Sequence, residues 1–367
     1  MSSPKNDPFV GREILDGQFR VTQRIGAGGM GSVYRCEEPA MGREVAIKIL
    51  HQRLKGRQDL VSRFRREARA MGQLSHPNTV RVFRYGELDD GSLYIVMEML
   101  EGKNLNQTVR RGGPLPVEKA IPILIACCQA LQEAHDMGIV HRDLKPENIF
   151  ICNQAGLVDY PKVLDFGLAK VTEAQMRPGS LILTQEGMVF GTPEFMSPEQ
   201  ARGQTLDARS DIYSLACILY EALTGKLPFD ATTPMEYVGK HVTAEPIPLN
   251  ERVPGLKFPE GLWKAIAKAL AKQKDARYQS ATDFARALAP FAPPGYAAAA
   301  FANAPPAHPA TSSAPPTKRS DAPPAQSAFA NAQAMRQAPT ITTLLGVALA
   351  CMILGGVAAM LIMRLLD

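Results

Sequence analysis

The residues best suited to chemistry lie in one short stretch, His141-Arg142-Asp143-Leu144-Lys145-Pro146-Glu147-Asn148, and in Asp165-Phe166-Gly167 further on. Asp143 can accept the proton of a hydroxyl group, and Lys145 can neutralise a phosphoryl group during its transfer. Asn148 and Asp165 offer the hard oxygen ligands that Mg²⁺ prefers. A charged turn is by default a solvated loop, but the order and spacing of all these residues argue against that interpretation.

A cluster of glycines lies closer to the N-terminus, in Gly26-Ala27-Gly28-Gly29-Met30-Gly31. Taken alone, the Gly-x-Gly-x-x-Gly spacing is a weak signal, because dinucleotide-binding folds use the same spacing. Those folds open a helix after the glycines, whereas the residues from Ser32 to Cys36 alternate like an antiparallel strand. We therefore predict a hairpin whose tip lets backbone amides approach an anion such as a chain of phosphates.

Lys48 and Glu67 are both charged where an apolar residue is expected. Lys48 stands inside an apolar strand, where a buried ammonium group without a partner would be costly. Glu67 falls in the inward-facing stripe of a predicted helix. The stripe consists of Leu60, Phe64, Glu67, Met71 and Leu74. We predict an ion pair between the two charges; the alternative is that both side chains extend from the surface into water.

The elements around these residues form a strand-rich segment followed by a helical one. Up to about residue 99 the sequence alternates as short strands, with one amphipathic helix between them. From about residue 100 helical periodicity dominates, as in residues 117–138 and 211–225. We predict an α+β fold with a small strand-rich lobe and a larger helical lobe.

Composition argues against several classes of protein. The formal net charge of +5 is spread along the chain and is too mild to indicate nucleic-acid binding. The six cysteines show neither Cys-x-x-Cys spacing nor nearby histidine partners, so we expect reduced thiols and no zinc site. Residues 1–18 form an N-terminal extension without the apolar core of a secretory signal, so the segment after it should stay in the cytoplasm.

The C-terminal part has a different composition. Residues 290–340 are rich in Ala and Pro with almost no large aliphatic residues, so we predict a disordered linker. Residues 341–363 are uncharged and apolar, and a helix of that length, at about 1.5 Å per residue, matches a bilayer core of roughly 30 Å. We predict a transmembrane helix there, with a buried core helix as the alternative, and a short tail at residues 364–367.

Together, these motifs resemble the protein kinases of the eukaryotic-like bacterial serine/threonine type over residues 19–289. The resemblance implies the two-lobed protein kinase fold, with the N-lobe up to about residue 99 and the C-lobe from about residue 100. It also implies ATP and Mg²⁺ as cofactors and protein serine or threonine hydroxyls as acceptors. The lysine two places after Asp143, together with Thr192, resembles serine/threonine kinases and not tyrosine kinases.

The resemblance also assigns roles in catalysis. Asp143 is the catalytic base, Lys145 steadies the γ-phosphate, and Lys48 contacts the ATP phosphates while it pairs with Glu67. The metal ligands are Asn148 and Asp165.

The nucleotide site follows in the same way. Met97 resembles the gatekeeper, Glu98 and Leu100 present backbone groups to adenine, and Asn104 lies near the ribose. The implied nucleotide-binding residues are Ile25, Gly26, Ala27, Gly28, Gly29, Met30, Gly31, Ser32, Val33, Ala46, Lys48, Met97, Glu98, Leu100 and Asn104.

Two later motifs, Gly191-Thr192-Pro193 and Ser197-Pro198-Glu199, resemble the end of a kinase activation segment, where Ser197 replaces the usual alanine. By resemblance Glu199 pairs with Arg277, and Asp211 braces the catalytic loop. Arg142 suggests activation by phosphorylation of the segment, because in similar kinases this arginine helps to bind a phosphorylated loop residue. The candidate phosphosites are Thr184 and, second, Ser180.

Two other functions compete with an active protein kinase. A catalytically inactive nucleotide-binding scaffold, or pseudokinase, usually lacks one of three residues that are present here, Lys48, Asp143 and Asp165. A small-molecule kinase of related fold would lack the Gly-Thr-Pro and Ser-Pro-Glu segments that build a peptide platform. Both segments are present, so the sequence favours a protein kinase.

The expected location is the cell (inner or plasma) membrane, spanned once, with the kinase domain in the cytoplasm. Basic residues before and after residues 341–363 favour this orientation only mildly. Small residues four apart, Gly346 with Ala350 and Gly355 with Ala359, would let two such helices approach, so a homodimer is an open alternative.

Overall fold

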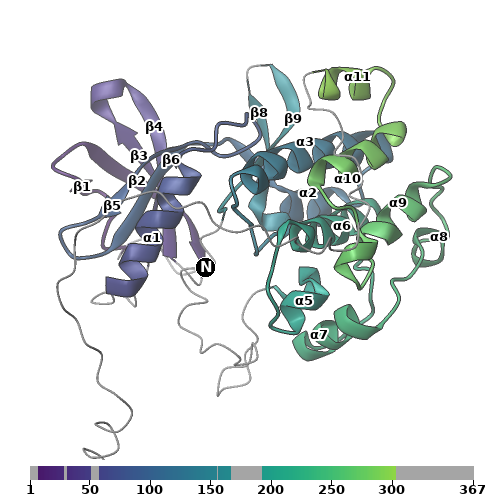
Figure 1. Ribbon diagram of the computed structural model, residues 1–367. Helices are drawn as coiled ribbons and strands as arrows, with labels where there is room; N and C mark the ends of the chain where they lie inside the picture. The colour runs from purple at the N-terminus through teal and green to yellow at the C-terminus, as the bar shows by residue number, and fades with distance from the viewer. Residues whose placement is uncertain (1–6, 29–30, 51–57, 155, 167–191, 303–367) are drawn as a thin grey trace, which may run out of the picture. The chain divides into compact units, whose positions relative to one another are not determined.

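The computed structural model describes residues 7–28, 31–50, 58–154, 156–166 and 192–302. All of them belong to the first of two compact units of the chain, residues 1–308. These residues form a strand-rich lobe followed by a helical lobe (Figure 1), as the sequence predicts.

The N-lobe is an antiparallel sheet with the strand order β1-β2-β3-β4-β6-β5. Its strands are β1 (Glu13–Ile14), β2 (Phe19–Gly28), β3 (Gly31–Glu38), β4 (Arg43–Leu50), β5 (Val82–Glu87) and β6 (Leu93–Glu98). Apolar side chains of β2, β3, β4 and β6 form a separate small core. Phe9, Ile14 and Leu15 of the N-terminal segment pack against this core, so the extension is part of the lobe.

The predicted glycine hairpin is confirmed. Strands β2 and β3 pair antiparallel up to Gly28 opposite Gly31, while Gly29 and Met30 lie outside the described residues. A Cβ atom on Gly31 would lie 2.2 Å from the backbone oxygen of Ile49 on β4. Only glycine therefore fits where β3 leaves the tip and passes β4.

Helix α1 (Gln58–Met71) is amphipathic, as its sequence predicts. Phe64, Ala68 and Met71 are buried in the main hydrophobic core, and Leu74 is buried just after the helix ends. Glu67 is half-buried. The side chain of Leu60, the first residue of the predicted stripe, lies outside the described part of the chain.

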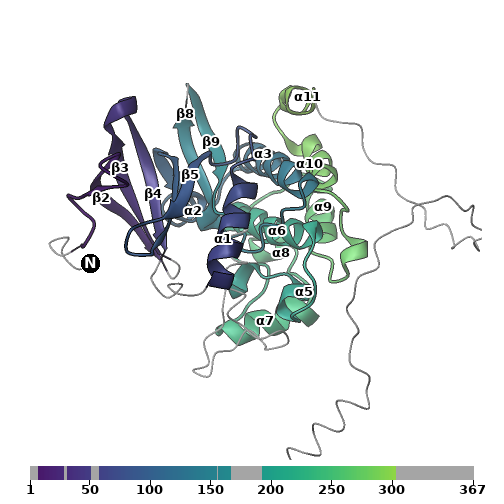
Figure 2. The ribbon, with the colours of Figure 1, turned by 60° about the vertical axis from the view of Figure 1, so that its left-hand side comes forward.

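The C-lobe is built around α6 (Ala208–Thr224), whose residues are almost all buried because other helices surround it. The other helices of this lobe are, in chain order, α2 (Leu105–Gly112), α3 (Val117–Asp136), α5 (Pro198–Ala201), α7 (Pro234–Thr243), α8 (Leu249–Arg252), α9 (Leu262–Ala269) and α10 (Ala281–Leu288). Helix α6 ends at Gly225, which adopts the left-handed conformation (φ 68°) typical of a helix C-terminus. Figure 2 shows α3 and α6 beside each other, in agreement with their contacts.

A buried ion pair joins the start of α5 to a late loop of the C-lobe. The two terminal guanidinium nitrogens of Arg277 donate to the two carboxylate oxygens of Glu199 at 2.8 Å, and the Ser210 hydroxyl donates to the same carboxylate at 2.6 Å. The Arg277 guanidinium group also donates to the backbone oxygens of Ala271 and Lys272. The pair implied by the kinase resemblance is therefore present, with its hydrogen bonds saturated as a buried pair requires.

A second buried pair links the lobes. The small sheet β7 (Gly102–Asn104), β8 (Ile149–Gln154) and β9 (Leu157–Val163) carries Lys162, whose ammonium group lies 2.6 Å from the carboxylate of Glu98 at the end of β6. Beside it, the Asn78 amide donates to the Pro161 carbonyl at 2.7 Å. The ion pair and the hydrogen bond therefore join the N-lobe to strand β9 of the small sheet.

The structure differs from the sequence prediction at residue 290, where we expect a disordered linker. Instead, the turn Ala289–Phe291 (η7) and helix α11 (Tyr296–Phe301) pack on the C-lobe core. The Tyr296 hydroxyl donates to the Pro122 carbonyl of α3 at 3.0 Å, and Gln129 donates to the Ala300 carbonyl at 2.6 Å. The aromatic rings of Phe291, Tyr296 and Phe301, spaced five residues apart, anchor this segment to the core. Its Ala-rich and Pro-rich composition makes these three residues easy to overlook in the sequence.

Residues 341–363, the predicted transmembrane helix, lie outside the described residues. Within residues 7–302, as far as the structure describes them, no helix is both long enough and apolar enough to cross a membrane. Five of the six cysteines lie in the described ranges, where they are buried free thiols.

Candidate active site

Asp211 in the first turn of α6 organises the stretch that contains Asp143. Its carboxylate accepts hydrogen bonds from the backbone N–H groups of His141 (2.8 Å) and Arg142 (3.0 Å), and it lies 2.7 Å from Nε2 of His135. Burial alone would raise the pKa of Asp211, but the hydrogen bond and charge of His135 outweigh it and hold the pKa below its ordinary value. An ionised, buried carboxylate thus anchors the loop, as the resemblance implies.

Arg142 has the left-handed backbone conformation, with φ 70°. This conformation costs energy for a residue with a side chain, and it persists only where the surroundings determine it. Here the N–H of Arg142 bonds Asp211, and its carbonyl accepts from the Gln200 side chain of α5 at 2.9 Å. The chain therefore turns at Arg142, immediately before Asp143.

Asp143 and Lys145 form the centre of the site. Their side chains are 2.7 Å apart and both are partly exposed, so they are accessible to a substrate. The Asn148 amide donates to the backbone carbonyl of Asp143 at 2.8 Å, which ties the two ends of the loop together. With its nitrogen engaged in this way, the side-chain oxygen of Asn148 is the atom that remains for a cation.

Asp165 connects this loop to the N-lobe. Its Oδ1 lies 2.8 Å from the Lys48 ammonium group on β4. Burial raises its pKa, but the charge and hydrogen bond of Lys48, with weaker contributions from His141 and Lys145, bring the pKa below its ordinary value. His141 also bonds the Leu164 carbonyl at 2.8 Å and packs on the ring of Phe166. The predicted pairing of Lys48 with Glu67 stays a prediction.

Strand register places several predicted nucleotide-binding residues on one face of the N-lobe sheet. Directly opposite residues in an antiparallel pair share a face, as do residues two apart in one strand. Val33 is opposite Lys48, and Ala46 is opposite Met97, so these four side chains lie on the same face. Ile25 is exposed at the base of the hairpin.

Two further predicted nucleotide-binding residues, Glu98 and Asn104, have structural partners of their own. The Glu98 side chain faces Lys162 and the backbone N–H of Arg81, so only its backbone is left for a ligand. Asn104 caps α2: its side-chain oxygen accepts from the Gln107 N–H at 2.8 Å. Its predicted place near a ribose remains a prediction.

The segment after residue 191 contributes two residues that sequence reasoning missed. Gln200 bonds the Arg142 carbonyl, and His241 of α7 bonds the Glu194 carbonyl at 3.1 Å. Neither stands in a recognisable motif, and each partner is distant along the chain. Thr184 and Ser180, the predicted phosphosites, lie outside the described residues.

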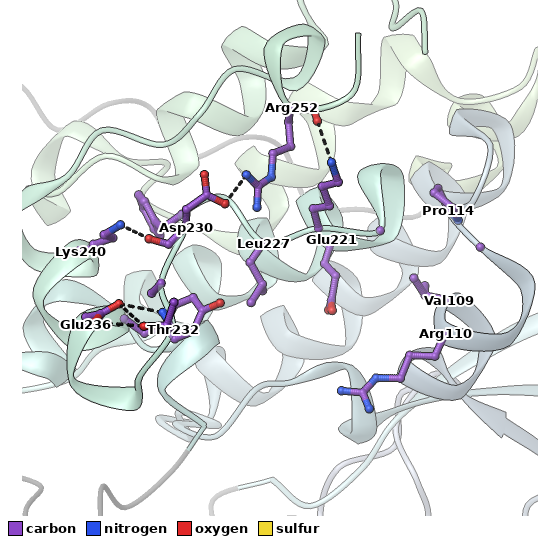
Figure 3. A pocket seen from close by; sticks show the side chains of 16 residues that line it. Val109, Arg110, Pro114, Glu221, Leu227, Asp230, Thr232, Glu236, Lys240 and Arg252 are labelled. Atoms are coloured by element: carbon purple, nitrogen blue, oxygen red, sulfur yellow. Dashed lines mark hydrogen bonds and ion pairs between the residues drawn. The ribbon is translucent and has the colours of Figure 1, made fainter. Parts of the chain in front are cut away.

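A separate pocket of about 860 Å³ lies between α2, the end of α6 and α7. Figure 3 shows Glu221 and Arg110 extending into it from different elements. Burial and the nearby carboxylates of Glu147 and Glu194 raise the pKa of Glu221 to about 7, against a smaller effect of Arg110. The pocket contains none of the predicted catalytic or nucleotide-binding residues.

The fold and this site define a two-lobed kinase domain, and comparison with known proteins agrees. Residues 19–286 match the protein kinase domain family, to which the chain therefore belongs. Among similar curated proteins, the serine/threonine-protein kinase pkn3 of Myxococcus xanthus is 41% identical over 284 residues, which are 77% of this chain and 51% of that protein. The serine/threonine-protein kinase PknB of Mycobacterium leprae is 40% identical over 272 residues, which are 73% and 42% of the two chains.

Solved structures show the same fold. The PknI kinase domain of Mycobacterium tuberculosis superimposes with a TM-score of 0.58 at 26% identity, covering 77% of this chain and 97% of that one. A structure of Rad53 in complex with AMP-PNP gives a TM-score of 0.61 at 26% identity, covering 75% and 66%. The chain spans about half or less of the length of these curated relatives.

Glu221→Gln should stabilise the protein at pH 8 and change little near pH 5. The folded protein holds the Glu221 proton up to about pH 7, whereas the unfolded chain releases it near the ordinary value of 4.5. The folded state therefore binds more protons between these values, and the free energy of unfolding falls as the pH rises through them. Each pKa unit corresponds to about 1.4 kcal/mol, which sets a gain of up to ~3 kcal/mol at pH 8.

Urea unfolding of both proteins at the two pH values measures this difference. Glu251→Gln, which changes an exposed carboxylate on α8, is the matched control and should show no such gain. An equal gain at both pH values, or none at pH 8, would contradict the account of Glu221.

Proposed function

We propose that this chain is an active protein kinase that transfers the γ-phosphate of ATP to serine or threonine hydroxyls of proteins. The observation that carries the proposal is the convergence of Lys48 and Asp165 with the Asp143 loop, held in place by buried Asp211. A pseudokinase is not favoured, because the three residues that such proteins usually lose are all present, and two of them, Lys48 and Asp165, form an ion pair. The AMP-PNP bound to Rad53, a structural relative, supports a nucleotide in the same fold.

The chemistry divides among a few side chains. Asp143 accepts the hydroxyl proton as the acceptor oxygen bonds to the γ-phosphorus and the bond from phosphorus to the bridging β–γ oxygen breaks. Lys145, 2.7 Å from Asp143, reduces the negative charge that develops on the transferring group. Lys48 orients the ATP phosphates from the N-lobe.

Asn148 and Asp165 would hold the divalent metal that protein kinases typically use. The Asn148 amide nitrogen is fixed by the Asp143 carbonyl, and Asp165 is kept ionised, so both present oxygen atoms. Two protein oxygens suit Mg²⁺, because this ion keeps several waters and phosphate oxygens in its coordination shell. When bound, the metal neutralises charge on the β- and γ-phosphates.

Asp143→Asn and Lys48→Met should each lower phosphorylation by at least about a hundredfold, because several kcal/mol of barrier depend on them and each ~1.4 kcal/mol is tenfold in rate. Incorporation of labelled phosphate from Mg²⁺-ATP into the protein itself and into myelin basic protein measures the effect. Mapping of the phosphorylated residues should place the wild-type autophosphorylation on Thr184 or, second, on Ser180. Any other phosphorylated residue should be a Ser or a Thr.

Asp159→Asn is the matched control for Asp143→Asn. Asp159 pairs with Lys119 on the surface at β9, and asparagine tolerates its left-handed backbone (φ 59°), so activity should be unchanged. Wild-type activity in folded Asp143→Asn or Lys48→Met protein would show that the site is misassigned.

We further propose that residues 341–363 anchor the kinase in the cell membrane, with the catalytic domain on the cytoplasmic side. The support is the uncharged apolar run of that segment and the need of the kinase for ATP. A tether of this kind would confine phosphorylation to substrates near the membrane and raise the local concentration of kinases.

Carbonate extraction of membranes tests the anchor. Full-length protein should remain in the membrane pellet, and a variant that ends at residue 339 should be released. Release of the full-length protein, or retention of the shortened one, would show that residues 341–363 are not the anchor.

A further inference from the structure

His241 is a buried polar residue that the proposed mechanism does not use. It lies in the last turn of α7 with no exposed surface. Its ring packs edge-on against Phe229 and Tyr213, at centroid distances of 5.0 and 5.6 Å. A polar ring in such surroundings is costly unless both nitrogens find partners.

Both nitrogens have partners, and simple chemistry fixes their roles. Nε2 lies 3.1 Å from the backbone carbonyl of Glu194, which can only accept, so Nε2 carries the hydrogen. Burial, reinforced by the charge of Lys272, holds the pKa of His241 at about 3, so the ring is neutral and Nδ1 is bare. Nδ1 then accepts the hydroxyl of Tyr213, 2.9 Å away on α6.

The Glu194 carbonyl belongs to the turn Pro193–Phe195 (η5), directly after Thr192. The next carbonyl, that of Phe195, accepts from the Ser214 hydroxyl of α6 at 2.7 Å. Two successive carbonyls of this turn are therefore fastened to α6, one directly and one through His241. The buried pair of Glu199 and Arg277 holds the helix that follows.

We propose that His241 is a positioning residue: its Nε2–H fixes the turn Pro193–Phe195 as the platform against which the protein substrate lies. The inference rests on the proposed kinase function. The described partners of His241 are Glu194, Tyr213 and Phe229, and none of them is a predicted ATP-binding residue. His241 therefore sets the affinity for the protein substrate and not that for ATP.

Two variants separate the roles of the nitrogens. In His241→Gln the terminal amide nitrogen takes the place of Nε2 and still donates to Glu194. In His241→Asn the shorter amide takes the place of Nδ1, so it can accept from Tyr213 but cannot reach Glu194. Both remove the ring, so they share its packing loss and form a matched pair.

The experiment measures KM for myelin basic protein and KM for ATP in wild type and both variants, with urea unfolding in parallel. We expect His241→Asn to raise the protein-substrate KM about tenfold with the KM for ATP within twofold of wild type, and His241→Gln to stay within threefold for both. Equal protein-substrate KM in the two variants, or losses that follow stability alone, would overturn the proposal.

Amide hydrogen exchange of residues 192–201 gives a readout that needs no catalysis. Exchange there should be at least tenfold faster in His241→Asn than in His241→Gln. Equal exchange in the two variants would overturn the positioning role. A wild-type protein without kinase activity that still shows the expected exchange difference would instead refute the proposed function and leave the role of His241 intact.

Discussion

The carboxylate of Asp211 is the interaction on which the rest of the site depends. It lies at the start of the most buried helix of the C-lobe, and it binds two successive backbone N–H groups of the loop that carries Asp143. A buried ionised group is stable only with such partners, so helix and loop stabilise each other. The left-handed Arg142 follows from this constraint, because its N–H must face the carboxylate.

From this anchor the structure extends in two directions. Toward the N-lobe, His141 supports the residues before Asp165, and Asp165 meets Lys48. Toward the proposed peptide site, the Arg142 carbonyl accepts a hydrogen bond from Gln200 of α5. The α5 helix is fastened by Arg277, and the turn before it is fastened by α6 and α7. One helix therefore sets the positions of both the proposed nucleotide site and the proposed peptide site.

The sequence alone predicts the two lobes, the glycine hairpin and the order of the catalytic residues, because these depend on local spacing. The resemblance also implies two contacts between distant residues that the structure shows, Glu199 with Arg277 and Asp211 with the loop before Asp143. Other contacts between residues far apart are missed. The Glu98 carboxylate forms an ion pair with Lys162, and His241 donates to the Glu194 carbonyl. Neither contact could be identified from periodicity or from a motif. The end of the folded domain, predicted at residue 289, is misplaced for a related reason. Phe291, Tyr296 and Phe301 order the Ala-rich segment because they pack on a surface that includes the distant helix α3.

The central claim is that a buried carboxylate holds the catalytic loop in its working conformation. The most direct measurement compares the turnover number for phosphorylation with the affinity for ATP in Asp211→Asn protein. The amide retains the shape but turns an N–H₂ group toward backbone N–H donors. The account predicts at least a hundredfold lower turnover with ATP affinity within threefold of wild type. Folded Asp211→Asn protein with wild-type turnover would contradict it.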